Sequence, residues 1–304
     1  MTDIRLYTGL CETTYNHHPV APGPYACISP VYGRAKTYET RVKIPTETRS
    51  IIQDSGAFSD NRFKRLSFEG ALDRQAAHGQ DWYYQGYITH RATYDLLIDE
   101  VWVNGNRFKR RWSELEAEDA VNTTIHAAQF LTRNRHGYNL IISAQAVTPA
   151  QYLKCAQRLM PTFQEGDWFG FGGWCITGLM PQIMMPVLRE TVSLVVPFLA
   201  KEGIKHIHIW GVIYPKALGV LLWECDQHGI TVSTDSVGPH MKPTRDKDWG
   251  YGEWRDNSYK AHPVQTRGLE RARHVALTRE WLGRFRTTPH YHPYSLPRKQ
   301  GVLF

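Results

Sequence analysis

Acidic and amide side chains stand at the ends of several short apolar runs in this sequence. In SIIQDSGAFSD, residues 50–60, two isoleucines lead into Asp54, which is followed by a small-residue turn. An isolated Asp at such a place often caps its own turn, and that interpretation stays open for Asp54 taken alone. Asp99, Gln145 and Asp235 stand at comparable positions. Together these residues predict a ring of polar groups around one cavity, in which paired carboxylates could perform different chemical roles.

The elements that would position these groups alternate between strand-like and helix-like segments. Strands are expected at residues 4–8, 25–29, 50–54, 96–102, 140–145, 168–172, 206–211 and 231–235. Helices are expected at residues 68–78, 114–133, 149–160, 180–201 and 215–228. This α/β order favours a closed (β/α)8 TIM-type barrel, whose active site would lie at the carboxyl ends of the strands. An open doubly wound sheet is the alternative, but no G-x-G-x-x-G follows the first strand to support a dinucleotide site.

Length and composition indicate an ordinary globular protein. Of the 304 residues, 42% are hydrophobic and 21% charged. We expect one domain over residues 1–304, with residues 262–304 as a basic, helical C-terminal extension. No apolar run approaches the roughly 20 residues that span a bilayer, and the N-terminus lacks the pattern of a signal peptide. We therefore expect a cytoplasmic protein with no membrane partner.

Cysteine usage argues against two kinds of site. The five cysteines are scattered along the chain, and no two of them form a C-x-x-C pair. This arrangement predicts neither a disulfide framework nor a cysteine-rich zinc site.

Positive charge is concentrated in three segments. The formal net charge is +7, and NRFKR occurs both at residues 61–65 and at residues 106–110. A third basic segment, residues 267–286, interleaves arginines with Trp281 and Phe285. Arginine beside aromatic rings suits phosphate contacts and base stacking, although a solvated helix face is the alternative. The residues expected to contact nucleic acid are Arg62, Lys64, Arg65, Arg107, Lys109, Arg110 and Arg111.

The segments at the expected strand ends resemble motifs of the tRNA-guanine transglycosylase superfamily, in that family's order. DSGAFS resembles its DSGGFQ motif, LLIDEVW its FDE strand, IISAQA its VQG strand, FGFGGW its IGGLA strand, HIHIWG its LMGVG strand and VSTDSVGP its FDCVxPTR strand. The resemblance covers residues 49–243, which is most of the chain. Each motif is weak alone, whereas the ordered set is specific.

The resemblance implies a (β/α)8 barrel that exchanges guanine in nucleic acid for a 7-deazaguanine through a covalent intermediate at the sugar C1′. It implies that Asp235 is the nucleophile and that Asp54 is the general acid and base. Asp99 would accept from the N1–H and amine of guanine, while Phe58 and Trp210 would sandwich the ring. The full set of implied base contacts is Phe58, Asp99, Gln145, Gly172, Gly173, Trp210 and Gly211.

The chain departs from the tRNA enzymes after Asp235. Those enzymes carry a C-x-C-x-x-C zinc cluster completed by a distant His, whereas no cysteine follows Cys225 here. We therefore expect no metal, no other cofactor and no zinc subdomain. The resemblance is closer to the short phage-type DpdA-like enzymes, which place 7-deazaguanines such as 7-cyano-7-deazaguanine (preQ0) into DNA.

That branch implies duplex DNA and a free 7-deazaguanine base as partners. The target guanine would have to be flipped out of the stack before it could react. The alternatives are the same exchange on tRNA and a non-catalytic nucleic-acid-binding subunit. The oligomeric state stays open between a monomer and an oligomer.

Overall fold

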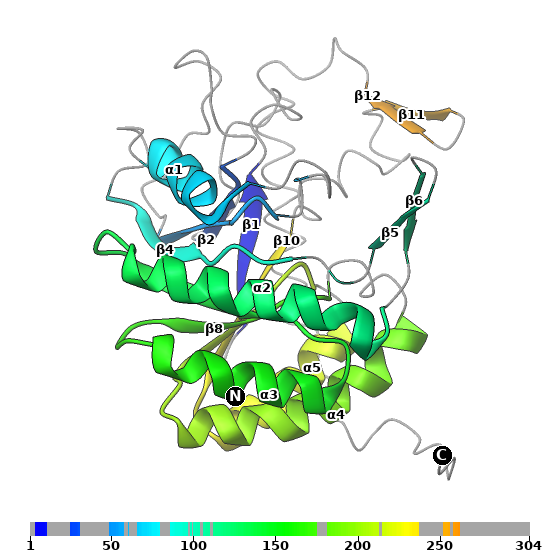
Figure 1. Ribbon diagram of the computed structural model, residues 1–304. Helices are drawn as coiled ribbons and strands as arrows, with labels where there is room; N and C mark the ends of the chain where they lie inside the picture. The colour runs from blue at the N-terminus through cyan, green and yellow to red at the C-terminus, as the bar shows by residue number, and fades with distance from the viewer. Residues whose placement is uncertain are drawn as a thin grey trace.

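Eight parallel strands close into a barrel, which confirms the predicted (β/α)8 fold (Figure 1). The computed structural model describes residues 4–10, 25–30, 49–57, 60, 66–79, 86–96, 98, 100–103, 106–109, 112–174, 181–212, 215–236, 252–255 and 258–261. The order around the barrel is β1-β10-β9-β8-β7-β4-β3-β2, and β2 pairs with β1 to close it. The strands are β1 (Arg5–Leu10), β2 (Tyr25–Ile28), β3 (Ser50–Gln53), β4 (Ile88–Ala92), β7 (Asn139–Ala144), β8 (Trp168–Phe171), β9 (His206–Ile209) and β10 (Thr231–Ser236).

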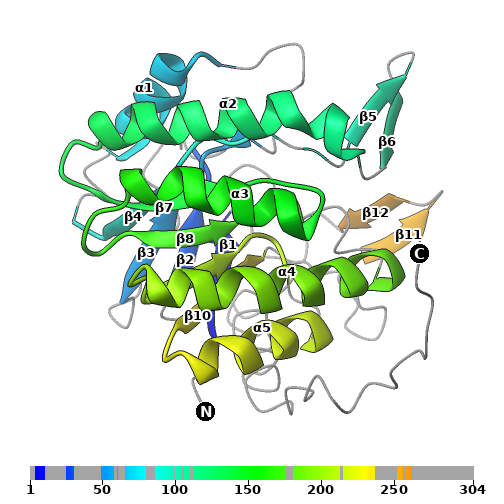
Figure 2. The same ribbon diagram turned by 60° about the horizontal axis from the view of Figure 1, so that its bottom comes forward.

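The described helices pack on the outside of the barrel. They are α1 (Phe68–Gly79), α2 (Glu114–Arg133), α3 (Pro149–Leu159), α4 (Pro181–Lys201) and α5 (Pro215–Gln227), with a 3-10 turn, η3, at Met160–Thr162. Figure 2 shows α2, α3, α4 and α5 side by side, and neighbours in this series contact one another. Ser113 starts α2 with a capping box, because its hydroxyl accepts from the Glu116 amide and the Glu116 carboxylate accepts from the Ser113 amide. The ends of these helices therefore agree closely with the sequence signals.

Apolar side chains fill the barrel and the space between its strands and helices. The inner cluster consists of Tyr7, Cys27, Ile52, Ala92, Ile141, Trp168 and Trp210. The outer cluster includes Ile142, Phe169, Leu188 and Leu221. Because the strands are covered on both faces, residues 140–144 of β7 are all buried.

The fourth barrel strand lies earlier in the chain than the sequence predicts. β4 is Ile88–Ala92, whereas the segment expected as a barrel strand, residues 96–102, leads into β5 (Glu100–Val103). β5 pairs with β6 (Asn106–Lys109) in a separate antiparallel hairpin, so the prediction of a barrel strand there was wrong. A second hairpin joins β11 (Gly252–Arg255) and β12 (Ser258–Ala261).

Buried polar side chains explain why β4 was missed. His90 is 7% exposed, and its Nε2 lies 3.1 Å from the Gly166 carbonyl oxygen. Arg91 is 4% exposed, with its guanidinium carbon 3.6 Å from the centroid of the Tyr138 ring. Neither residue fits the pattern of an apolar run, although both are covered in the fold. The acid that follows this strand is Asp95 rather than Asp99.

Within the described ranges, no helix is both long enough and apolar enough to cross a bilayer.

Candidate active site at the barrel rim

Asp54 stands in a tight turn at the carboxyl end of β3. Its N–H donates to the Ile28 carbonyl at 2.8 Å, and its Oδ1 accepts from the Ser55 N–H at 2.7 Å. Gly56 has a φ of 77°, in the left-handed region that glycine adopts without strain. Asp54 therefore does cap its own turn, and it does so on the rim where barrel active sites are built.

Helix α1 holds this turn in place. Gln75 is buried, and its Nε2 donates to the Asp54 carbonyl at 3.1 Å and to the last carbonyl of β4 at 2.9 Å. Arg74 donates to the Ser55 carbonyl at 2.7 Å and to both carboxylate oxygens of Asp60, at 2.7 and 3.0 Å. These bonds fix the backbone on both sides of the Asp54 carboxylate.

Asp95 and Gln145 meet at the carboxyl ends of two adjacent strands, β4 and β7. The Nε2 of Gln145, which is fully buried, donates to Oδ2 of Asp95. Ser55 Oγ donates to Oδ1 of Asp95 at 3.3 Å, so the Asp54 turn and Asp95 are joined. Oε1 of Gln145 is buried and has no hydrogen-bond partner among the described residues. This position therefore offers an open acceptor beside a carboxylate.

Gly172 and Gly173 make room for the Gln145 amide. A Cβ on Gly172 would lie 2.6 Å from Gln145 Nε2, and a Cβ on Gly173 would lie 2.9 Å from Oε1. The Gly172 N–H donates to the Ala144 carbonyl at 2.9 Å, and the Gly172 carbonyl accepts from the Tyr152 hydroxyl. That N–H is thus engaged within the barrel, whereas Gly172 was expected among the base contacts.

Asp235, near the end of β10, is held through one carboxylate oxygen. The Gly211 N–H donates to Oδ1 at 2.8 Å, and Nε2 of His208 lies 3.3 Å from the same atom. The Asp235 side chain is 21% exposed, whereas that of His208 is completely covered. Gly211, expected among the base contacts, therefore directs its N–H to Asp235. None of the described hydrogen bonds engages Oδ2.

Burial and two neighbouring carboxylates raise the pKa of Asp54 to about 7. Desolvation is the largest cause, followed by the charges of Asp235 and then Asp95, while two backbone N–H groups of the turn oppose the rise. Burial and the charges of Asp235 and Asp54 hold the pKa of Cys27, on β2, well above its usual value. The three acids are thus close enough to interact, and Asp54 can exchange a proton near neutral pH.

Trp210 forms part of the barrel interior. It is 8% exposed, and its Nε1 donates to Ser143 Oγ at 2.9 Å. Its ring contacts that of His208, with centroids 4.2 Å apart. A Cβ on Gly170 would lie 2.9 Å from Trp210 Nε1, so Gly170 makes room for the indole. Trp210 lies beneath the rim, and its stacking on a base stays a prediction.

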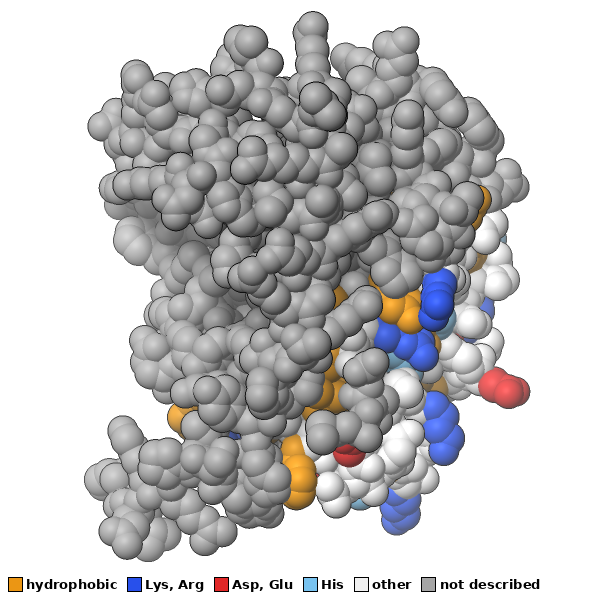
Figure 3. Space-filling view, turned by 180° about the vertical axis from the view of Figure 1, so that it is seen from behind, with side chains coloured by type: hydrophobic (Ala, Val, Ile, Leu, Met, Phe, Trp, Pro, Cys, Tyr) orange, Lys and Arg blue, Asp and Glu red, His pale blue; other side chains and the backbone are white. Residues whose placement is uncertain are grey.

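The remaining expected site residues fall wholly or partly outside the described residues. Phe58, Asp99, Arg62, Lys64, Arg65, Arg110 and Arg111 lie outside them. Arg107 and Lys109 lie on β6, where the backbone alone is described. Figure 3 shows Lys and Arg side chains at several separate places on the described part of one face. The expected contacts of these residues with base and phosphate stay predictions.

Sequence reasoning did not single out Asp95 or His208. The pattern HIHI of β9 could have indicated His208, because alternation in a strand places His206 and His208 on one face. Asp95 can be recognised as an acid at a strand end only when the fourth barrel strand is placed at Ile88–Ala92.

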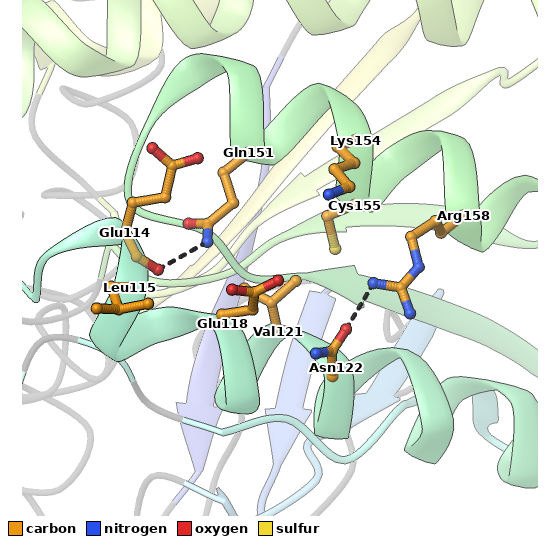
Figure 4. A pocket seen from close by; sticks show the side chains of 9 residues that line it. All are labelled: Glu114, Leu115, Glu118, Val121, Asn122, Gln151, Lys154, Cys155 and Arg158. Carbon is orange, nitrogen blue, oxygen red and sulfur yellow. Dashed lines mark hydrogen bonds between the residues drawn. The ribbon is translucent and has the colours of Figure 1, made fainter.

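A hollow of about 350 Å³ lies between α2 and α3, on the outside of the barrel (Figure 4). Gln151 Nε2 donates across it to the Glu114 carbonyl at 3.2 Å, and Arg158 donates to Asn122 Oδ1 at 2.6 Å. None of the expected site residues lines it. The side chains in this hollow therefore join the two helices.

Within the ranges that the structure describes, no three His, Cys, Asp or Glu side chains are grouped as potential metal ligands. The histidines at 262, 274, 290 and 292 lie outside those ranges.

Fold and site together define a (β/α)8 barrel with acids and an amide gathered on the carboxyl-end rim. No protein-family model and no curated protein matches the sequence. Among solved structures, the chain is similar to one described as L-ribulose 3-epimerase, with 11% sequence identity and a TM-score of 0.36, over 93% of this chain and 96% of that chain. A similarity this low carries no argument about the reaction.

Proposed function

We propose that the protein is a pentosyltransferase that exchanges guanine in DNA for a 7-deazaguanine, with Asp235 as nucleophile and Asp54 as general acid and base. The observation that carries the proposal is the pair of unequal acids on one rim. The pKa of Asp54 is raised to about 7, whereas Asp235 accepts a backbone N–H bond and faces an imidazole nitrogen. Such inequality suits one acid to carry a proton and the other to attack.

In the first step, Oδ2 of ionised Asp235 attacks C1′ of the target nucleotide. The bond between C1′ and N9 of guanine breaks, its electron pair stays on the base, and protonated Asp54 gives its proton to the leaving guanine. The Gly211 N–H, bonded to Oδ1, keeps the carboxylate in place for attack through its other oxygen. Splitting one displacement into two steps is the advantage of a covalent intermediate.

In the second step, the Asp54 carboxylate takes the N9 proton of the incoming 7-deazaguanine. N9 then attacks C1′, and the ester bond to Asp235 breaks to restore the carboxylate. The pKa of Asp54 near 7 suits both directions of proton transfer at neutral pH. Protons balance over the cycle, because Asp54 gives one and recovers one.

For recognition of the base we assign Asp95 the role that the sequence suggested for Asp99. Asp95 follows barrel strand β4, is joined to the Asp54 turn through Ser55, and accepts from Gln145. A carboxylate there can accept from the N1–H and the amine of guanine. The open Oε1 of Gln145 supplies a further acceptor, and its amide group a donor for O6.

The test is incubation of the protein with labelled 7-cyano-7-deazaguanine and either duplex DNA or tRNA, followed by digestion and mass spectrometry of the nucleosides. We expect label in a deoxynucleoside, and none with Asp235→Asn, because an amide is a poor nucleophile. Label in a ribonucleoside alone would assign the exchange to tRNA. Absence of label in both nucleic acids would overturn the proposal.

A further inference from the structure

A continuous chain of hydrogen bonds runs from Asp235 down the inside of the barrel. His208 Nε2 lies 3.3 Å from Asp235 Oδ1, and His208 Nδ1 lies 2.8 Å from Ser233 Oγ. Ser233 Oγ lies 2.7 Å from Nε2 of His206, whose Nδ1 lies 2.6 Å from Thr231 Oγ1. The chain thus joins the rim to the amino-terminal ends of β9 and β10, and the function proposed above gives its middle members no role.

The inner members of this chain are closed to solvent. Ser233 and His208 have no exposed surface, and His206 is 5% exposed. His206 also stacks on Trp168 with ring centroids 3.7 Å apart. Burial is the main reason that the pKa of His206 is lowered to about 2, so this ring is neutral and carries one N–H.

One N–H on His206 leaves two possible directions for the chain. If the hydrogen is on Nε2, His206 donates to Ser233, and Ser233 donates to Nδ1 of His208. The hydrogen of His208 is then on Nε2 and points at Asp235. Thr231 donates to His206 in this arrangement, while the Lys205 carbonyl keeps its bond from the Thr231 N–H at 3.0 Å.

If the hydrogen of His206 is on Nδ1, the chain runs the other way. His206 donates to Thr231, Thr231 donates to the Lys205 carbonyl at 3.1 Å, and Ser233 donates to Nε2 of His206. Nδ1 of His208 must then donate to Ser233. A His208 ring with its one hydrogen on Nδ1 would turn a bare Nε2 toward the Asp235 carboxylate oxygen, lone pair to lone pair, so the 3.3 Å contact disfavours this direction. The first direction, which places an N–H of His208 against Oδ1 of Asp235, is therefore the one that fits the contact.

We propose that His208 is a positioning residue that holds Oδ1 of Asp235 through its Nε2–H, and that Ser233 and His206 fix the ring in the orientation this requires. The proposal rests on the assignment of Asp235 as nucleophile. With Oδ1 held from two sides, by Gly211 and by His208, the carboxylate presents Oδ2 in one direction only. Consecutive hydrogen bonds of one direction polarise one another, which strengthens the last bond at Asp235.

Two variants test this role in the exchange assay. In His208→Phe a ring fills the same space without nitrogen, so we expect kcat to fall roughly 10- to 100-fold, as misplacement of a reacting group typically causes. KM for 7-deazaguanine should be unchanged, because Asp95 and Gln145 bind the base. His208→Gln should restore most of kcat, since its amide can place an N–H near the position of Nε2.

The matched control is His90→Phe. His90 is another buried histidine of the barrel interior, and its ring lies against the same Trp168 with centroids 3.7 Å apart. Its hydrogen-bond partners are Gly166 and Thr89, which are not members of the hydrogen-bond chain. We expect its substitution to lower the melting temperature and leave kcat unchanged. If His208→Phe behaves like this control, or if His208→Gln is as slow as His208→Phe, the positioning role is wrong.

A nitrogen NMR experiment separates this inference from the proposed function. In protein labelled with nitrogen-15 histidine, the His208 signals are those missing from His208→Gln. At neutral pH we expect a proton on Nε2, and finding Nε2 bare with the proton on Nδ1 alone would overturn the inference. This measurement needs no substrate, so failure of base exchange would refute the proposed function and still leave the His208 contact tested.

Discussion

At the scale of single residues, the acids of the rim differ in what surrounds them. Asp54 accepts from its own turn and lies among other carboxylates, whereas Asp235 is held by the Gly211 N–H and faces His208. Asp95 is joined to both Ser55 and Gln145. Each acid therefore has its own chemistry despite the shared location, and each can be examined by a neutral replacement.

Asp54→Asn should stabilise the protein, increasingly so as the pH rises from about 4 to about 7. The folded-state pKa of Asp54, about 7, lies above its ordinary value, so the folded protein keeps a proton that the unfolded chain has released. Stability of the wild type therefore decreases with rising pH through this range, by at most about 1.4 kcal/mol per pH unit for one group. Asparagine is neutral at every pH and lacks this decrease. Urea unfolding of both proteins across this range measures the difference, and an identical pH dependence would contradict the raised pKa.

Asp95→Asn should impair use of 7-deazaguanine more than Asp99→Asn does. Hydrogen bonds to a charged group contribute roughly 1.5–3 kcal/mol, so we expect KM for the base to rise roughly 10- to 100-fold for Asp95→Asn. Asp99→Asn serves as the matched control, because Glu100–Val103, which follow Asp99 in the chain, pair in a hairpin outside the barrel. A larger effect at Asp99 would return the base-binding role to that residue.

At the scale of elements, the sequence locates seven of the eight barrel strands and misplaces β4. The expected helix at residues 114–133 is α2 with the same bounds, and the capping box of Ser113 and Glu116 marks its start in the sequence. β4 carries no such local signal, because it buries two polar side chains, His90 and Arg91. The free-energy cost of burying them is offset by contacts with residues that are distant in the sequence. Those contacts exist only in the folded barrel. The acid that follows the fourth barrel strand is therefore Asp95, where Asp99 was expected, while Asp54, Gln145 and Asp235 do lie on one rim.

The opposite end of the barrel depends on Asp167, just before β8. Its buried carboxylate accepts from two nitrogens of Arg135, at 2.8 and 3.0 Å, and from the N–H groups of Leu140 and Gln164, at 2.8 and 2.9 Å. Breaking a buried ion pair costs about 3–5 kcal/mol, so Asp167→Ala should lower the free energy of unfolding by about that amount. Base exchange should persist below the new melting temperature, because Asp167 lies away from the rim. Ser113→Ala, which removes a cap worth about 1 kcal/mol, provides the comparison in the same denaturant assay. Equal decreases in the two variants would contradict the importance of the pair.

At the scale of the whole molecule, the excess of positive charge bears on the partner. A formal charge of +7 favours approach to a polyanion, whatever its sequence. The two NRFKR segments flank the expected base-binding residue Asp99 in the chain. Their contribution can be measured without knowledge of the target sequence.

Replacing one cluster by alanine should weaken DNA binding across all sequences. The clusters are Arg62, Lys64 and Arg65 in the first segment, and Arg107, Lys109 and Arg110 in the second. The slope of log affinity against log salt should become shallower by roughly one for every phosphate that the variant no longer binds. Exchange at saturating DNA should survive, since the reacting groups are unchanged. If affinity and slope both equal those of the wild type at several salt concentrations, these side chains are a solvated face, and DNA follows the arginines of residues 267–286 instead.

The thiol of Cys27 is buried close to the acids of the rim. A thiolate so close to Asp54 and Asp235 would compete for an electrophilic carbon, yet burial and those two charges keep the pKa of Cys27 well above its usual value. A thiol that stays protonated is a poor nucleophile and reacts slowly with oxidants and alkylating reagents. The acids of the rim thus protect a neighbouring side chain from covalent damage.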